Sequence, residues 1–431
     1  MAEAKQMGDA APLAGVRILD LTTIMLGPFA SQQLGDYGAD VIKIEAPGGD
    51  ATRQIGPSPE VDMAAAFLGV NRGKRSIVLD LKQSTARDAL FALIDNADVL
   101  LHSMRPQKMA ALGFSPEALL ERNPRLIVVA AHGFGEDGPY AGRPAYDDII
   151  QGLCGLAGLS ADQGGEPSYV PSVIADKICG MFATQAVLMG LVRRAREGSG
   201  VYVEVPMLES MVHFTLIEHF YGAHFVPPEG EAGYPRLLTR WRRPYRTTDG
   251  YVCIVPYTDR HWRLFFSEAG VPEYADDPRF MGIGARTRHI DELYRLVGER
   301  VAMCSSAVWL AACDRLDIPA APLNRLADLE RDPHLMAVGM FPTVDDAALG
   351  KVKLVAPPMR FNGKRPPVAM PPRLGEHTNE ILAQAGIGTS AREAMLASGG
   401  AIQFYPNTAD GEGVVETNSP ATGYTISGVT S

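Results

Sequence analysis

The chain has 431 residues, of which 46% are hydrophobic and 21% are charged. This composition is typical of globular proteins and excludes collagen-like, coiled-coil and disordered classes. The length predicts two to four domains, or one large domain that carries a smaller insert. Forty Lys and Arg residues stand against fifty Asp and Glu residues, giving a formal net charge of -10. This charge argues against nucleic acid as a partner, since phosphate backbones repel an acidic protein.

The cysteine pattern and the apolar segments indicate a cytoplasmic protein. The five cysteines are scattered without a C-x-x-C pair, which fits a reducing compartment better than a disulfide framework or a zinc site. The longest apolar stretch, 178–192, is interrupted by Thr184 and Gln185, so we expect a buried helix and no membrane partner. The N-terminal residues lack an apolar segment behind Lys5, so we expect neither secretion nor an anchor. No His pair has H-E-x-x-H spacing, so we expect no metal site.

In chain order, short apolar runs alternate with segments of helical periodicity. The runs predict strands at 16–21, 40–45, 76–81, 99–102, 126–131 and 201–206. The segments between them predict helices at 28–35, 85–96, 116–122 and 176–198. This alternation predicts an α/β fold with a parallel sheet.

A smaller α+β unit is expected after about residue 227. Aromatic-rich strands surround an Asp249-Gly250 turn, and an amphipathic helix and further helical stretches continue to about Met336. Extended connections and a helix at 376–384 follow. The Gly-, Thr- and Ser-rich tail from about Ala401 has no periodicity, and we expect it to be poorly ordered.

The first strand-helix-strand unit invites a dinucleotide-binding interpretation, because Glu45 ends the second strand where a ribose-binding acid is often found. The phosphate loop is missing, however. Gly27 and Gly35 are too far apart to form G-x-G-x-x-G, and Pro28 removes a backbone donor. We therefore expect no nicotinamide or flavin cofactor, and interpret Glu45 as a strand-end carboxylate.

A basic cluster precedes the third strand, where Arg72, Lys74 and Arg75 surround Gly73. A run of charges is usually a solvated face. Together with Arg53 and Arg105 in the same α/β unit, the cluster also fits a phosphate-bearing anionic ligand. The sequence leaves both interpretations open.

Asp176 lies at the threshold of the long predicted helix, after a Gly- and Pro-rich loop. One interpretation is a helix N-cap that accepts backbone N–H bonds. The other is a nucleophile, since a carboxylate can attack a thioester to give an anhydride. In that role, helix N-terminal donors would keep the carboxylate ionised and stabilise the developing oxyanion.

Several motifs, in a fixed order, resemble the class III CoA-transferases (the CaiB-BaiF or formyl-CoA transferase-like family). The resemblance spans about Pro12 to Leu382, and the tail beyond about Ser390 lies outside it. It is carried by VRILDLTTIMLGPFASQQLGDYGADVIKIEAPGGD, NRGKRSIVLDLK, MRPQKMAALGF, GPYAGRPAYDDIIQGLCGLAGL, VIADKICGMF, DGYVCIVPYTD and PPRLGEHTNEIL.

The resemblance implies a Rossmann-like large domain built from both chain ends, a smaller inserted α+β domain, and a homodimer of interlocked chains. The corresponding boundaries are 1–224 for the first part of the large domain, 225–336 for the small domain, 337–392 for the return segment and 393–431 for a poorly ordered extension.

The resemblance also implies an enzyme that moves CoA from an acyl-CoA donor to a carboxylic acid acceptor. Asp176 matches the family nucleophile, which passes through a mixed anhydride and an aspartyl-CoA thioester. CoA and its thioesters are then substrates, with no tightly bound cofactor. Residues matched to the CoA site are Thr23, Met25, Asn71, Lys74, Arg75, Arg105 and Tyr146. Met25 replaces a glutamine that often assists the nucleophile, so backbone donors would have to stabilise the oxyanion.

Two further positions bear on the reaction type. Asp147 matches a carboxylate that positions an acceptor or water, and its alternative role is a second helix cap. Tyr146 stands where acyl-CoA racemases of the same fold have a catalytic His, and tyrosine is a poor base at neutral pH. We therefore favour CoA transfer over racemisation or epimerisation. A CoA-ester-binding protein without catalysis is the third alternative.

Overall fold

The computed structural model describes residues 11–405. These residues form two compact units. The larger unit comprises residues up to 150, 173–211 and those from 337 onwards, and the smaller comprises 151–172 and 212–336. The smaller unit thus begins at 212 where the expected small domain began at 225, and it takes in the additional segment 151–172.

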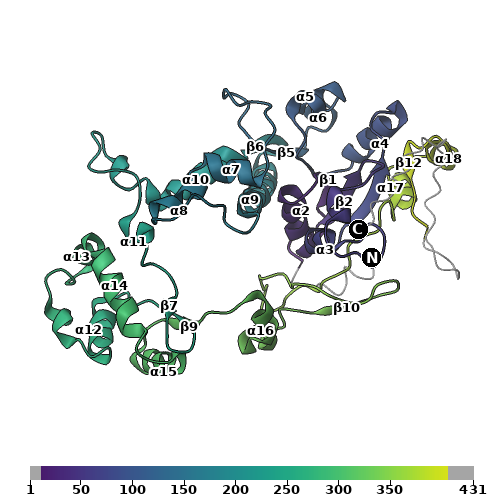
Figure 1. Ribbon diagram of the computed structural model, residues 1–431. Helices are drawn as coiled ribbons and strands as arrows, with labels where there is room; N and C mark the ends of the chain where they lie inside the picture. The colour runs from purple at the N-terminus through teal and green to yellow at the C-terminus, as the bar shows by residue number, and fades with distance from the viewer. Residues whose placement is uncertain (1–10, 406–431) are drawn as a thin grey trace, which may run out of the picture. The chain divides into compact units, whose positions relative to one another are not determined.

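A seven-stranded sheet forms the centre of the larger unit (Figure 1). Its strands are β1 (Arg17–Leu21), β2 (Asp40–Glu45), β3 (Arg75–Leu79), β4 (Val99–His102), β5 (Ile127–His132), β6 (Val201–Pro206) and β12 (Ala401–Ile402). The spatial order is β12-β3-β2-β1-β4-β5-β6, and every neighbouring pair is parallel except β12 with β3. The predicted parallel sheet is therefore confirmed, in the strand order of doubly wound folds, which bind ligands at the carboxyl ends of their strands.

The central strands are apolar because helices cover both faces of a parallel sheet. All six residues of β5 are buried, as are all four residues of β4. Leu100, Val128 and Ile77 pack with residues of α4 and α17 in one core cluster. This burial on both faces explains why the strands appear in the sequence as nearly continuous Ile, Leu and Val runs.

Helices and short connections complete the larger unit. They are α2 (Leu26–Asp36), η2 (Ala51–Gln54), α3 (Ala65–Val70), α4 (Ser84–Ile94), α5 (Pro106–Ala111), α6 (Pro116–Arg122), α9 (Ile174–Glu197), α17 (Thr378–Gln384), α18 (Thr389–Ala397) and the hairpin β10 (Thr343–Asp346) with β11 (Gly350–Lys353). Helices α7 (Asp147–Leu153), α10 (Met207–His219) and α16 (Pro333–Ala337) cross from one unit to the other.

The 24-residue helix α9 ends as its sequence predicted. Gly198 follows it in the left-handed conformation at φ 77°, which glycine adopts without strain. Within residues 11–405, α9 by itself is long and apolar enough to cross a membrane, although Thr184 and Gln185 interrupt its apolar stretch. Core helices pass the same test, and α9 packs against α2, β5 and β6.

The C-terminal part of the chain returns to the sheet that the N-terminal part began. Figure 1 shows α17 and α18, in yellow, beside the purple N-terminal strands. Strand β12 pairs antiparallel with β3, and Thr378 Oγ1 donates a hydrogen bond to the Ile402 carbonyl (2.6 Å). The prediction of a poorly ordered extension from residue 393 is therefore wrong for residues 393–405. Residues 406–431 lie outside the described residues.

The smaller unit is an α+β arrangement around an antiparallel three-stranded sheet. The sheet has the order β7 (Tyr245–Arg246), β8 (Tyr251–Ile254), β9 (Ala320–Pro322). Its helices are η3 (Leu156–Gly158), α8 (Leu159–Asp162), η4 (Tyr221–His224), α11 (Pro235–Leu238), α12 (Asp259–Glu268), η5 (Pro272–Asp276), α13 (Ile283–Arg288), α14 (Ile290–Val301), α15 (Ser306–Leu316) and η6 (Leu326–Arg331). Trp262, Phe265, Phe266 and Trp309 belong to a hydrophobic core of its own.

Candidate active site

The connection from β1 to α2 is held in a strained conformation. Ile24 has φ +70°, a region that β-branched residues rarely adopt because the side chain crowds the backbone. Both carboxylate oxygens of Asp50 accept the Ile24 N–H at 3.2 Å, and Lys43 Nζ donates to Asp50 (2.8 Å) in a fully buried pair. Strain of this kind costs roughly 1–3 kcal/mol and persists because the surroundings enforce it. The buried pair therefore fixes the path of the adjoining Thr23 and Met25.

The beginning of α2 packs closely against the second turn of α9. A Cβ atom on Gly180 would lie 2.7 Å from the Leu26 carbonyl oxygen, so only glycine permits this approach. Four residues later, Thr184 Oγ1 donates to the Ala30 carbonyl oxygen (3.4 Å). Because Gly180 lies one turn after Asp176, the connection that contains Met25 and the start of α9 belong to the same region of the larger unit.

Asp176 is the third residue of α9 and does not cap it. The N-cap is Val173, whose side chain makes no capping bond. Instead, the Asp176 backbone N–H donates to Oδ1 of Asp147 (3.0 Å), the first residue of α7. The N-cap interpretation of Asp176 was therefore wrong. Asp147 thus accepts a backbone N–H from the first turn of α9, a helix other than its own.

The electrostatic environment raises the pKa of the Asp176 carboxyl to about 7. Burial is the main cause, and the negative charges of Asp147 and Asp148 add to it. The raised pKa runs against the expectation that helix donors favour the ionised form of this carboxyl group, because burial and the two neighbouring carboxylates favour the protonated form. The result is a carboxylate more basic than usual, which suits a nucleophile or a base.

Lys74, expected at the phosphate groups of CoA, lies in the interior. Its side chain is 0% exposed, and Nζ donates to Asp20 Oδ2 (3.0 Å), Asn71 Oδ1 (2.8 Å) and the Pro28 carbonyl (3.0 Å). Burial lowers the pKa of Lys74 to about 8. Although burial also acts to raise the pKa of Asp20, the ammonium groups of Lys74 and Lys43 bring it down to about 2. All three N–H donors of Lys74 are thus used inside the unit, and so is the Asn71 carbonyl.

The other cations of the basic cluster also have protein partners. Arg75 forms a two-point pair with Asp40 and a further bond to Glu380, and Arg72 pairs with Asp36. Arg53 pairs with Glu45 through two hydrogen bonds of 2.8 and 2.7 Å. These contacts confirm Glu45 as a strand-end carboxylate. Neither interpretation of the basic cluster, a solvated face or a site for an anionic ligand, describes most of these cations. They pair with acids of the protein instead.

Arg105 differs from these cations because its side chain faces solvent. It is exposed, directly before α5, and donates one hydrogen bond to the Gly142 carbonyl (3.3 Å). With Gln107, Lys108, Ala141 and Gly142 it lines an open cavity of about 480 Å³. Within residues 11–405 no carboxylate forms an ion pair with Arg105 or Lys108, so this cavity presents two unneutralised cations. Tyr146, before α7, is 70% exposed, as a surface ligand contact requires.

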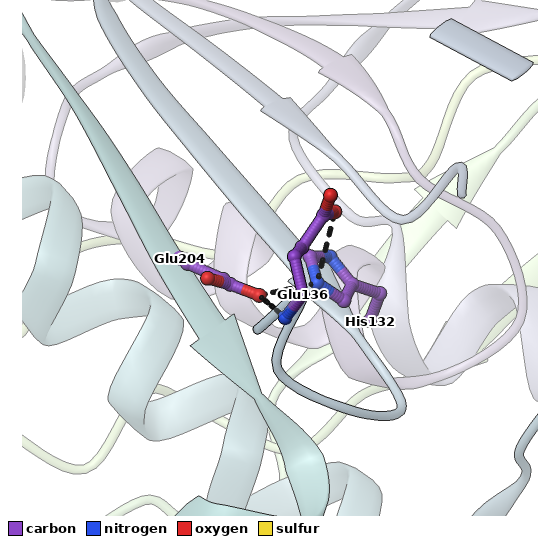
Figure 2. Close-up of side chains that lie close together, drawn as sticks. All are labelled: His132, Glu136 and Glu204. Carbon is purple, nitrogen blue, oxygen red and sulfur yellow. Dashed lines mark hydrogen bonds and ion pairs between the residues drawn. The ribbon is translucent and has the colours of Figure 1, made fainter. Parts of the chain in front are cut away.

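A second titratable cluster lies at the carboxyl end of β5 and on the neighbouring strand β6 (Figure 2). His132 Nε2 lies 2.8 Å from Glu204 Oε1 and 3.6 Å from Glu136 Oε1, and the Glu136 N–H donates to the same Glu204 oxygen (2.9 Å). This donor set can hold a metal ion. In the neutral imidazole, donation from Nε2–H to Glu204 leaves Nε2, the nitrogen that faces the two glutamates, without a lone pair for a metal. Moving the proton to the buried, unpartnered Nδ1 would leave an N–H without an acceptor, so the cluster favours hydrogen bonding.

Sequence reasoning missed the buried polar residues that support the site. Asp20, Lys43 and Asp50 are nearly inaccessible, and together they hold the connection that leads to α2. The sequence did contain one signal, the lysine inside the apolar strand DVIKIE. A lysine is almost never fully buried without a partner, so its place in a buried strand indicates a buried acid nearby. The His132 cluster combines three separate segments, so no spacing motif reveals it.

Comparison with known proteins identifies relatives of this chain. The model of the family described as CoA-transferase family III matches residues 13–378. Succinyl-CoA:glutarate CoA-transferase from Mus musculus is 31% identical and aligns over 90% of each chain. Formyl-CoA:oxalate CoA-transferase from Escherichia coli is 29% identical, over 89% of this chain and 98% of the relative.

Solved structures show the same architecture. A CAIB/BAIF family protein from Brucella suis superposes with a TM-score of 0.72 at 31% identity, covering 87% of this chain and 100% of that one. An Asp-to-Ala mutant of Rv3272 from Mycobacterium tuberculosis has a TM-score of 0.75 at 30% identity, covering 86% and 98%.

The buried pair of Lys74 and Asp20 predicts a large stability effect. We expect Lys74→Met to lower the free energy of unfolding by about 3–5 kcal/mol, because it leaves the Asp20 carboxylate buried beside one cation fewer. Urea unfolding followed by circular dichroism measures the loss. Adding Asp20→Asn should restore most of it, whereas Arg75→Gln, at a partly exposed pair, should cost about 1 kcal/mol. Equal losses in Lys74→Met and Arg75→Gln would contradict this role for Lys74.

Proposed function

This chain belongs to CoA-transferase family III, and we propose that it moves CoA from an acyl-CoA donor to a carboxylic acid with Asp176 as the covalent nucleophile. The observation that carries the proposal is the environment of Asp176. Its carboxyl group is partly buried, its pKa is raised to about 7, and it lies one helical turn from the contact between α9 and α2. A carboxylate of raised basicity is a better nucleophile toward a thioester than an ordinary surface aspartate.

The proposed reaction balances without an external reagent. An Asp176 oxygen attacks the donor carbonyl carbon, the C–S bond breaks, and CoA leaves as a thiolate to give a mixed anhydride. The thiolate then attacks the Asp176 acyl carbon and releases the donor acid as a carboxylate. The acceptor carboxylate attacks the resulting aspartyl-CoA thioester, and CoA thiolate leaves again. Attack of the thiolate on the acceptor acyl carbon forms the product and regenerates Asp176.

Backbone donors at the start of α2 are the proposed oxyanion site. Met25, the N-cap residue, makes no side-chain capping bond, so the first turn of α2 is not capped by its own N-cap residue. The helix dipole places partial positive charge at this end. Because α2 begins at Leu26, next to the strained connection, its direction is fixed before substrate binds. These donors take the role that a glutamine side chain would have at position 25.

Arg105 and Lys108 are the proposed contacts for the phosphate groups of CoA. They line the same open cavity and have no carboxylate partner within the described residues. Thr23, Met25 and Tyr146 are accessible enough to contact the rest of the CoA molecule. We assign Lys74 and Asn71 a positioning role instead, since their bonds hold the first turn of α2, and Arg75 supports the return segment through Glu380.

Dicarboxylic acids are the proposed acceptors. The relatives named above are transferases for glutarate and for oxalate, both of which are dicarboxylic acids. A panel of mono- and dicarboxylic acids with succinyl-CoA as donor identifies the acceptor.

Covalent trapping tests the nucleophile. We expect incubation with succinyl-CoA, followed by hydroxylamine or borohydride, to modify Asp176 alone, as seen by peptide mass spectrometry. Asp176→Asn should still bind CoA esters but lose transfer by at least about a thousandfold, since no anhydride can form. Arg105→Ala should show the complementary result: CoA esters bind more weakly, while the trapped residue is still Asp176. Transfer near wild type in Asp176→Asn would remove this residue from the mechanism. Solvent deuterium at the α-carbon without modification would instead favour racemisation.

The raised pKa of Asp176 predicts a pH dependence. Transfer should increase as pH rises through about 7, because only the ionised carboxylate is nucleophilic. Asp148→Asn removes a negative charge that raises this pKa, so its rate profile should move to lower pH. Asp88→Asn, an exposed acid on α4, is the matched control and should leave the profile in place. A shift toward higher pH in Asp148→Asn would contradict the assignment.

We extend the proposal to a homodimer of interlocked chains. One face of α9 exposes Met181, Leu188, Met189 and Val192, although its opposite face is buried in the larger unit. A row of large apolar side chains on a regular helix is typical of an interface. Light scattering should therefore give twice the 46.3 kDa chain mass, and Met189→Glu with Val192→Glu should lower it. A monomeric wild type would contradict this assembly.

A further inference from the structure

The smaller unit carries an arginine-rich segment whose residues the proposed transfer mechanism does not use. Five arginines occur between residues 236 and 246, namely Arg236, Arg240, Arg242, Arg243 and Arg246. Within residues 11–405, none of them forms an ion pair with a carboxylate. This differs from the larger unit, where Arg53, Arg72 and Arg75 each pair with an acid. Unpaired cations so close together are unusual in a chain of net charge -10.

Three of these arginines surround one cavity. Arg236, Arg242 and Arg243 line a space of about 280 Å³ together with Tyr294 and with the apolar side chains of Pro244, Ile254, Val255 and Pro256. Arg236 is held in place, since its Nε donates to the Tyr294 hydroxyl (2.9 Å). The cavity therefore combines guanidinium groups, a fixed hydrogen-bonding partner and an apolar wall.

The charges of all three guanidinium groups act on the Tyr245 phenol, which lines the same cavity. Burial, followed by the effect of Tyr294, raises the pKa of the Tyr245 phenol, and the charges of Arg236, Arg242 and Arg243 all act against this rise. Three cations within reach of one phenol repel one another, and no acid of the described residues pairs with them. A bound anion would remove this repulsion, and guanidinium forks match the paired oxygens of carboxylate and phosphate.

We propose that this cavity binds a small organic dianion, with carboxylate or phosphate oxygens held by Arg242 and Arg243 and a short carbon skeleton against the apolar wall. The volume suits a molecule of a few carbon atoms and excludes a whole CoA molecule. Two or more negative charges are specified because three cations line the site. The inference rests on no step of the transfer reaction, and binding is measured without acyl-CoA.

Trp241 provides a local reporter. Arg243 lies over its indole ring with its guanidinium carbon 5.2 Å from the ring centroid, and both residues line the adjoining cavity. A ligand that draws Arg243 toward itself changes this cation–π contact and hence the indole emission. Trp262 and Trp309 are buried in the core of the unit, so Trp241→Phe identifies the part of the signal that comes from the site.

The test is a titration of the full-length protein with succinate, inorganic phosphate and acetate at constant ionic strength, by calorimetry and tryptophan emission. We expect saturable binding of at least one dianion, with acetate at least about tenfold weaker. Arg242→Ala with Arg243→Ala should weaken dianion binding at least about tenfold, since each lost charge-assisted bond is worth about that factor. Arg263→Ala, an exposed arginine on α12 outside the cavity, is the matched control and should bind like wild type.

The outcomes separate the ligand sources and the two proposals. Succinate binding alone identifies a carboxylate ligand, and phosphate binding alone identifies a phosphate ester. No saturable binding, equal affinity for acetate, or the same loss in Arg263→Ala as in the double variant would each overturn the proposal. The Asp176→Asn variant should keep the emission change while losing transfer, so failure of the transfer mechanism leaves this result intact.

Discussion

The buried contact between Lys74 and Asp20 is the interaction on which the larger unit depends. It joins the end of β1 to the segment before β3, and its third hydrogen bond holds the first turn of α2 through the Pro28 carbonyl. A charge pair without solvent is tolerated only when every donor and acceptor is satisfied, and the Ser31 and Thr22 hydroxyls complete the set around Asp20. The start of α2 is thereby fixed, and with it the connection that contains Met25.

Asp176 and Asp20 have neighbouring charges of opposite sign. Around Asp20 the nearest charges are cations, which lower its pKa, while around Asp176 they are carboxylates, which raise it. Burial disfavours the charged form of both groups, so the sign of the neighbouring charges decides between a structural anion and a reactive one. Asp147 contributes twice, because it takes the backbone donor of Asp176 and adds a like charge.

Much of the fold could be predicted from local sequence. The six parallel strands lie within one or two residues of the expected apolar runs, because strands buried on both faces must be continuously apolar. Strand β12 could not be predicted, since two residues after a pair of glycines carry no periodicity and pair only through contact with β3. The strain at Ile24 was equally invisible, as isoleucine is unexpected at positive φ and Asp50 is distant in sequence.

By itself, the sequence determined the α/β class, the family resemblance and the place of Asp176 at the beginning of a long helix, because periodicity and motifs are local properties of a chain. Only the tertiary structure decided what each charge does. Lys74 and Arg105 are both cations near strand ends, yet one is enclosed by three acceptors and the other faces solvent. The physical reason is that the effect of a charge depends on its burial and on its partners, and these partners are distant in sequence: Asp20 lies 54 residues from Lys74, and Glu380 lies 305 residues from Arg75.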